Sequence, residues 1–261
     1  MTAADAVQEN LVEFFRHFAR VRGTGQTEEL DGVSIAASGI AFHMFNAAFL
    51  SAPVTGGEED LACRIDLAAT RLGSGGGRWA FWACEERLRE CISFKASRVF
   101  RRRGLTPALR HPGMVSERLA PARRRLPDLE IRPVQDRPSR AVFAHINAVA
   151  FHIPYEWCLQ LYDLEALWGG AFVGHVGYSG GEPVSTVATL AAAGAIGIYA
   201  VATLPAYEHR GFAEAMTRYG LALAQEQSGI RRSILQATSA GLPLYHRMGY
   251  DVVTHFTVFS A

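Results

Sequence analysis

The segment ATLPAYEHRGFAEAM, residues 202–216, joins an uncharged run to a helix-like pattern through a short basic loop. Apolar residues recur at a 3.6-residue spacing over 211–227, which predicts a helix there. The first N–H groups of a helix have no intrahelical partner and lie at the positive end of its dipole, so they favour an anion. Gly211 lets a ligand approach the backbone closely, and Arg210 adds a positive charge. These are the features that a loop binding phosphate groups needs, and the alternative is an ordinary turn between a strand and a helix.

A second reactive group follows downstream, in the stretch LYHRMGY. Tyr245 precedes Gly249 by four residues, and the glycine predicts the end of a short helix. A tyrosine hydroxyl can donate or accept a hydrogen bond, so Tyr245 is a candidate site residue. The alternative is an aromatic core residue at the end of a short helix. The basic loop upstream favours the chemical role.

Composition and charge limit the classes of function. The chain has 261 residues, a net charge of +1, and nine arginines between residues 98 and 127. A neutral chain has no overall field that attracts nucleic acid, so we interpret the arginine-rich segment as a solvated helix end and linker, with nucleic-acid contact as the alternative. The four cysteines form no CxxC pair and no metal-ligand spacing with histidine. We expect a cytoplasmic protein without a metal ion or a nucleic-acid partner.

One uncharged stretch, residues 183–205, nearly reaches the length of a membrane span. Its alanine- and glycine-rich middle separates two runs rich in β-branched residues, which favours two buried strands joined by a turn. The N-terminal residues carry acids and no apolar run, so they do not read as a signal peptide. We therefore expect no membrane contact.

The order of elements predicts a mixed α/β fold with a boundary near residue 126, between domains 1–126 and 127–261. In the second domain we expect strands at 129–134, 171–178, 183–190, 196–204, 231–238 and 251–259, and helices at 138–150, 211–227 and 241–249, with another starting near Pro154.

The first domain repeats part of this order, with strands at 45–53 and 78–86 and helices at 58–72 and 94–105. Phe100 and Gly104 then fall where Tyr245 and Gly249 fall in the second domain. This correspondence indicates a diverged duplication, and chance agreement of a common strand–helix order is the alternative. The GSGGGR stretch, 73–78, is interpreted as a flexible linker.

The joint pattern of a strand, the loop Glu208-His-Arg-Gly-Phe-Ala213 at a helix start, and Tyr245 four residues before Gly249-Tyr250 resembles the GNAT superfamily of acetyl-CoA-dependent N-acetyltransferases. The resemblance covers about residues 129–261 and implies a GNAT-like fold with a mixed sheet there, and a diverged GNAT-like unit before it. The family usually has arginine or glutamine where this chain has Glu208. A carboxylate is unfavourable beside a pyrophosphate, whereas backbone N–H donors do not depend on the side chain.

The resemblance also implies the site residues and the co-substrate, acetyl-CoA. The implied coenzyme contacts are the backbone of Val201, Ala202 and Thr203, along the pantetheine arm, and the loop residues His209, Arg210, Gly211, Phe212, Ala213 and Glu214, around the phosphates. A backbone N–H of the strand would polarise the acetyl carbonyl, and Tyr245 would act as the general acid. His152 and Glu165 fall where the family places acceptor contacts, with ordinary surface residues as the alternative.

The leading hypothesis is direct acetyl transfer to an amine of a small molecule or peptide by the C-terminal domain. The N-terminal domain should be silent, because Phe100 lacks a hydroxyl and VTGGEED replaces the basic loop. The alternative is a non-catalytic acyl-CoA-binding sensor or interaction module. The acceptor and the oligomeric state do not follow from the sequence.

Overall fold

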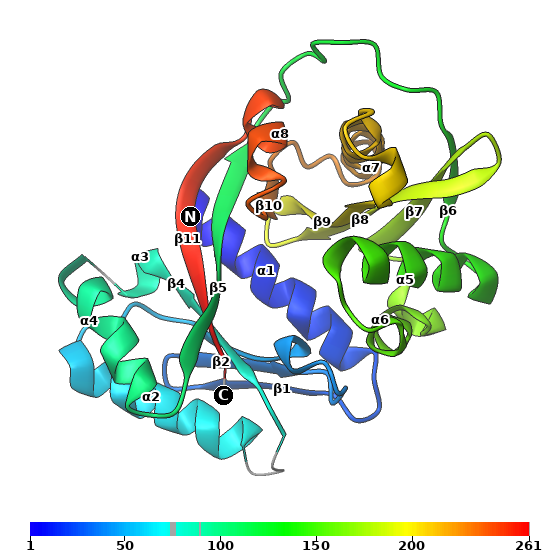
Figure 1. Ribbon diagram of the computed structural model, residues 1–261. Coiled ribbons are helices and arrows are strands. Elements are labelled where there is room, and N and C mark those ends of the chain that lie inside the picture. The colour runs from blue at the N-terminus through cyan, green and yellow to red at the C-terminus, as the bar shows by residue number, and fades with distance from the viewer. Residues whose placement is uncertain (74–76, 89, 261) are drawn as a thin grey trace. The chain divides into compact units, whose positions relative to one another are not determined.

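The computed structural model describes residues 1–73, 77–88 and 90–260, and the side chains of 90–94 lie outside that description, as does the middle of the predicted linker at 73–78 (Figure 1). The chain forms two compact units. The C-terminal unit comprises Met114–Asp251 together with Met1, and the N-terminal unit comprises Thr2–Gly113 together with the chain from Val252 onward.

The units do not divide where the sequence predicts. The expected boundary near residue 126 is replaced by a change of unit at Met114, and the last strand, β11 (Asp251–Ser260), returns the chain to the N-terminal unit. The reason is strand pairing. β11 runs antiparallel to β4 (Ala80–Cys84), with Phe256 opposite Cys84 and Ser260 opposite Ala80.

The N-terminal unit has the strand order β1-β2-β3-β4-β11-β5, in which β3 and β4 are parallel and β1, β2 and β3 are antiparallel neighbours. Its further elements are α1 (Ala3–Arg20), β1 (Gln26–Leu30), β2 (Val33–Ala37), η1 (His43–Phe45), β3 (Asn46–Leu50), α2 (Gly57–Leu72), α3 (Glu85–Leu88), α4 (Glu90–Arg101) and β5 (Thr106–Ser116). The four predicted elements appear as β3, α2, β4 and α4. The interpretation of the arginine-rich segment as a linker is wrong for β5, whose exposed first half gives no alternating apolar signal.

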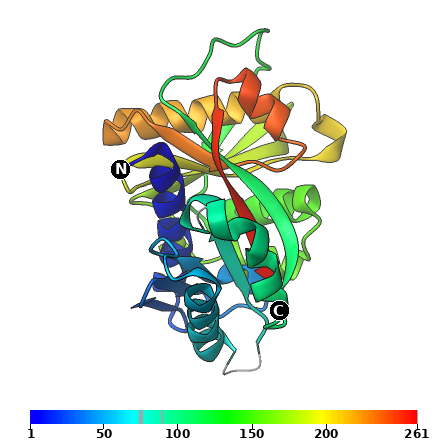
Figure 2. The same ribbon diagram turned by 90° about the vertical axis from the view of Figure 1, so that its left-hand side faces the viewer.

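The C-terminal unit has the strand order β10-β9-β8-β7-β6, with β9 and β10 parallel and the other neighbours antiparallel. Its elements are β6 (Glu130–Pro133), α5 (Arg137–Phe151), α6 (Tyr155–Tyr162), η2 (Glu165–Leu167), β7 (Phe172–Ser179), β8 (Glu182–Ala192), β9 (Ala195–Thr203), η3 (Pro205–Tyr207), α7 (Phe212–Ser228), β10 (Ser233–Gln236) and α8 (Leu242–Arg247). The predicted mixed α/β fold is confirmed, with α7 on one face of the sheet and α5 on the other (Figure 1, Figure 2).

The uncharged stretch at 183–205 forms the antiparallel pair β8–β9, as the sequence predicts. In the part of the chain that the structure describes, no helix is long and apolar enough to cross a membrane. The helix α7 packs closely against this pair of strands at Gly220, which faces Val187. A Cβ atom on Gly220 would lie 3.1 Å from a Val187 methyl group. A small residue in the helix thus brings α7 against the sheet.

The two helix ends that the sequence matches have the same local geometry. The N–H of Leu105 donates to the Phe100 carbonyl at 3.1 Å, and the N–H of Tyr250 donates to the Tyr245 carbonyl at 3.0 Å. The glycine before each donor has a positive φ, +78° at Gly104 and +92° at Gly249, which closes the helix in the left-handed conformation. Phe100 itself is fully buried.

A carboxylate of the chain itself binds the backbone just before α2 in the N-terminal unit. Asp60 Oδ2 accepts the N–H groups of Thr55 at 2.9 Å and Gly56 at 3.1 Å, and Asp60 Oδ1 pairs with Arg64 Nε at 2.7 Å. Burial raises the pKa of Asp60, but these hydrogen bonds outweigh it and hold the pKa below its usual value. Arg64 continues the cluster to the Ala52 carbonyl, at 2.6 Å.

Asp60→Asn should destabilise the protein by about 1–3 kcal/mol, because the variant leaves Arg64 without its charge partner. The difference should shrink below about pH 4, since a carboxyl whose pKa is lowered in the folded state contributes stability that is lost as the pH falls. Urea unfolding of wild type and variant across this pH range measures it. The matched control is Asp66→Asn, which removes an exposed pair with Arg103 and should cost less than about 1 kcal/mol. Equal losses in the two variants would contradict the assignment.

Candidate functional site

The strand β9 carries a bulge near its carboxyl end. Here a single residue of β8, Val187, lies opposite two residues of β9, Ala200 and Val201. Ala200 has a φ of +49°, a conformation that is uncommon for a residue with a side chain. A bulge of this kind bends the strand and re-aims the peptide groups beyond it.

Past the bulge, β9 and β10 no longer pair. Their registered pairs lie at Ile196 and Gly197, whereas the pairing of β9 with β8 continues to Thr203. The predicted docking residues Val201, Ala202 and Thr203 therefore have β8 on one side, and no registered partner from β10 on the other. This part of β9 is the edge of the sheet that an extended ligand could join.

Two hydroxyl groups of β8 turn the β9 carbonyl groups in a fixed direction. Thr186 Oγ1 donates to the Ala200 carbonyl at 2.8 Å, and Ser185 Oγ donates to the Ala202 carbonyl at 2.6 Å. The C=O and N–H groups of a trans peptide point in opposite directions, and none of the peptide bonds that the structure describes is cis. The N–H of Val201 consequently points away from Thr186, in the part of β9 that has no registered partner from β10.

The loop after β9 ends in a helix start without a side-chain cap. His209 and Gly211 both have positive φ values, +61° and +91°, and Gly211 is the N-cap residue of α7. The N–H of Ala215 makes the first bond back to the Gly211 carbonyl, at 3.0 Å. The N–H groups of the three residues between them, Phe212, Ala213 and Glu214, precede this first bond of the helix.

Two guanidinium groups lie beside this helix start. Arg210 is exposed and its guanidinium carbon lies 5.2 Å from the centre of the Tyr207 ring. Arg124 Nη2 donates to the His209 carbonyl at 3.4 Å and lies 3.4 Å from where a Cβ atom on Gly211 would stand. Arg124 is not among the predicted site residues, although it belongs to the arginine-rich segment, because nothing local in the sequence pairs that segment with the loop. Glu208 is exposed.

Two of the predicted coenzyme residues turn their side chains inward. The Phe212 ring is buried and meets the Tyr207 ring edge-on at 6.0 Å. The Glu214 carboxylate is buried too and pairs with Arg218 at 2.8 Å, while Arg218 also donates to the Ala120 carbonyl at 2.8 Å. Phe212 and Glu214 thus offer the loop their backbone N–H groups rather than their side chains.

Tyr245 is buried on α8 and lies beside α7. Its ring meets the Tyr250 ring at 5.8 Å. Burial and the neighbouring Tyr250 raise the pKa of Tyr245, and a hydrogen bond with the Thr217 side chain only partly offsets them. Thr217 Oγ1 in turn donates to the Ala213 carbonyl at 2.8 Å, one turn from the helix start. The Tyr245 hydroxyl is therefore protonated at neutral pH, as a proton donor must be, and lies against the helix that begins at the loop.

The two predicted acceptor residues lie elsewhere in the unit. His152 is the C-cap of α5 with a φ of +54°, and Glu165 is the first residue of η2, and both are exposed. Within the described residues, no hydrogen bond or ion pair links either side chain to the loop or to Tyr245. Their role in the site remains a prediction.

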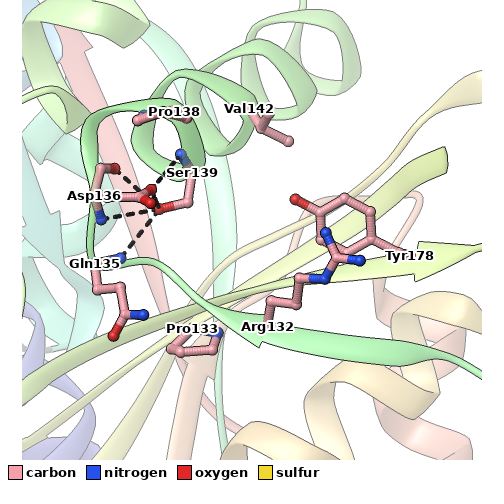
Figure 3. Close-up of a pocket in the computed structure, with 8 residues that line it drawn as sticks. All are labelled: Arg132, Pro133, Gln135, Asp136, Pro138, Ser139, Val142 and Tyr178. Carbon is pink, nitrogen blue, oxygen red and sulfur yellow. Dashed lines mark hydrogen bonds between the residues drawn. The ribbon is translucent and has the colours of Figure 1, made fainter. Parts of the chain in front are cut away.

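A pocket of about 350 Å³ lies at the far edge of the sheet, between β6, β7 and the start of α5 (Figure 3). Arg132 covers the Tyr178 ring at 4.2 Å there, and Asp136 and Ser139 cap α5 by hydrogen bonds to each other. β6 and β10 stand at opposite ends of the strand order in this unit, so the pocket does not belong to the loop. Among the described residues, no three or more His, Cys, Asp or Glu side chains gather as a metal site would require.

Residues 183–253 match the family of acetyltransferase (GNAT) domains. This segment begins in β8 and ends in β11, so it includes the bulge, the loop and Tyr245. No curated protein sequence matches the chain.

Solved structures share the fold over nearly the whole chain. A GCN5-related N-acetyltransferase from Kribbella flavida superposes with a TM-score of 0.73 at 16% identity, covering 99% of this chain and 95% of its own. A functionally unknown conserved protein from Staphylococcus epidermidis gives 0.64 at 17% identity, with 93% and 96% covered. A GCN5-related N-acetyltransferase from Sphaerobacter thermophilus gives 0.54 at 16% identity, with 100% and 93% covered. Residues 183–253 thus match the GNAT domain family, and the chain shares the fold of GCN5-related N-acetyltransferases over nearly its whole length.

Proposed function

We propose that the C-terminal unit is an N-acetyltransferase that moves the acetyl group of acetyl-CoA directly to an amine of a small molecule or peptide. The observation that carries the proposal is the open edge of β9, where the Val201 N–H points away from Thr186. The same strand leads into an uncapped helix start flanked by two arginines. One surface therefore provides a strand edge for an amide-bearing arm and a helix end for phosphates.

In this proposal the pantetheine arm lies along Val201, Ala202 and Thr203 and adds to the sheet as an extra strand. The pyrophosphate accepts the free N–H groups at the start of α7, where the helix dipole favours negative charge. Arg210 and Arg124 supply positive charge on either side. Glu208 is exposed to solvent, and the backbone donors remain available whatever its side chain.

The transfer itself is an acyl substitution. The neutral amine attacks the thioester carbonyl, and the Val201 N–H stabilises the negative charge that develops on the carbonyl oxygen. The carbon–sulfur bond then breaks, and the Tyr245 hydroxyl gives its proton to the departing thiolate. The nitrogen loses its second proton to water as the amide forms, and a proton from water restores the Tyr245 hydroxyl. The amine loses a proton before the attack, and His152 and Glu165 are the candidates for the base, directly or through water.

The N-terminal unit is silent in this proposal. Just before its corresponding helix, the Asp60 carboxylate already accepts the N–H groups of Thr55 and Gly56. Phe100 stands at the position of Tyr245 and has no proton to give.

The cysteines Cys63, Cys84 and Cys158 are free, which agrees with the reducing cytoplasm where we place the protein.

A non-catalytic acyl-CoA-binding module is the second candidate. Two observations favour it: an acidic residue, Glu208, stands in the loop, and the Tyr245 hydroxyl is already bonded to Thr217. In such a module the coenzyme would bind in the same place without turnover. Binding and turnover must therefore be measured separately.

Binding is tested by calorimetric titration of acetyl-CoA into wild type and Gly211→Glu. A side chain at 211 needs an unfavourable positive φ and brings a carboxylate to the phosphates, so affinity should fall roughly tenfold or more. Gly229→Glu is the matched control, because Gly229 also has a positive φ, +72°, but caps the other end of α7. No binding to wild type, or equal affinity in the two variants, would refute the phosphate-binding loop.

Turnover is tested by steady-state kinetics of Tyr245→Phe over a panel of amines. Loss of the proton donor should lower kcat by roughly 100-fold or more while acetyl-CoA affinity stays unchanged. Tyr250→Phe is the control: it removes a neighbouring buried hydroxyl that accepts from Ser233 at 2.9 Å, and should keep its rate. An unchanged rate in Tyr245→Phe would remove the general acid. Binding without turnover on any amine in wild type would favour the second candidate.

A further inference from the structure

A chain of buried hydrogen bonds connects α5 to the bulge of β9. Asn147 Nδ2 on α5 donates to Thr186 Oγ1 on β8 at 3.1 Å, and Thr186 Oγ1 donates to the Ala200 carbonyl at 2.8 Å. Asn147 is 1% exposed and Thr186 is fully buried. The three residues thus link the helix on one face of the sheet to the one strained residue at the opened edge.

The direction of this chain is fixed by its ends. Asn147 Nδ2 also donates to the Phe143 carbonyl at 2.9 Å, and because a carbonyl only accepts, the nitrogen must face that side. The Thr186 hydroxyl therefore accepts from Asn147 and has its single proton left for Ala200. The Thr186 hydroxyl proton therefore has one acceptor, the Ala200 carbonyl, and this hydrogen bond holds the carbonyl in one orientation.

The buried side-chain amide of Asn147 lowers the stability of the fold. Asn147 Oδ1 is buried and accepts no hydrogen bond within the described residues. An unpaired buried acceptor destabilises a fold, and an apolar residue of similar size would avoid it. Ala200 adds a second cost, because a φ of +49° is strained for a residue with a Cβ atom. Two unfavourable features meet at one point of the sheet, which is typical of functional positions.

We propose that Asn147 and Thr186 are positioning residues that hold the peptide between Ala200 and Val201. They fix the Ala200 carbonyl, and so they aim the Val201 N–H at the open edge where the acetyl carbonyl would lie. Neither residue touches the coenzyme. The inference rests on the proposed function for its catalytic consequence, while the orientation of the peptide itself is independent of any ligand.

Three variants of β8 test it. Thr186→Val keeps the shape of the side chain and removes the hydroxyl, and Thr186→Ser restores the hydroxyl. Thr189→Val is the matched control: Thr189 is 3% exposed on the same strand, and its methyl group faces Gly220 of α7. The three proteins are compared by amide hydrogen exchange in peptides covering 199–204 and by acetyl-CoA-dependent kinetics.

Thr186→Val should speed exchange in 199–204 and lower kcat/KM, each by roughly three- to tenfold, the effect of one lost hydrogen bond. Exchange elsewhere should stay as in wild type, and Thr186→Ser and Thr189→Val should behave as wild type. Asn147→Leu should act in the same direction as Thr186→Val. If Thr186→Val exchanges no faster in 199–204 than Thr189→Val, the positioning role is overturned.

The exchange measurement separates this inference from the proposed function, because it needs no coenzyme. Faster exchange in Thr186→Val, in a protein that does not bind acetyl-CoA, would support the hydrogen-bond chain and overturn the proposed function. Normal exchange in a protein that binds and acetylates would overturn the hydrogen-bond chain alone.

Discussion

The rest of the site depends on one mismatch in strand pairing, two residues of β9 opposite a single residue of β8. The extra residue turns the peptide at Ala200, in the part of β9 that follows its last registered pair with β10, at Gly197. Because the loop and α7 continue directly from the same strand, the bulge also sets where the helix start lies relative to the open edge.

An acidic residue near the start of a helix has different hydrogen-bond partners in the two units. In the N-terminal unit, Asp60 brings an internal carboxylate to the free N–H groups before α2, and Arg64 neutralises it. In the C-terminal unit, the comparable acid, Glu214, pairs with Arg218 instead, so its carboxylate does not accept the N–H groups at the start of α7. Both carboxylates pair with the arginine four residues further on, and Asp60 also accepts backbone N–H groups that lie just before its helix.

The buried polar residues around the site follow a similar logic. Thr217, next to Tyr245, and Thr186, next to Ala200, each donate to a backbone carbonyl in a part of the fold that apolar side chains could fill. Such groups add little net stability, since they exchange bonds to water for bonds within the protein. Their effect is to select one orientation of a peptide or a hydroxyl, which a binding or catalytic site requires.

By itself the sequence determined the local elements of the C-terminal unit, the mixed α/β fold, the basic loop before α7 and the glycine that ends α8, because periodicity and turn chemistry act over a few residues. Only the tertiary structure decided that β11 completes the N-terminal unit, that β9 carries a bulge, and that Arg124 reaches the loop. Each of these depends on a partner far away in the chain, and the register of strand pairing leaves no mark on either strand alone. The pairing of Glu214 with Arg218, by contrast, is local, because the two residues lie one turn apart on α7.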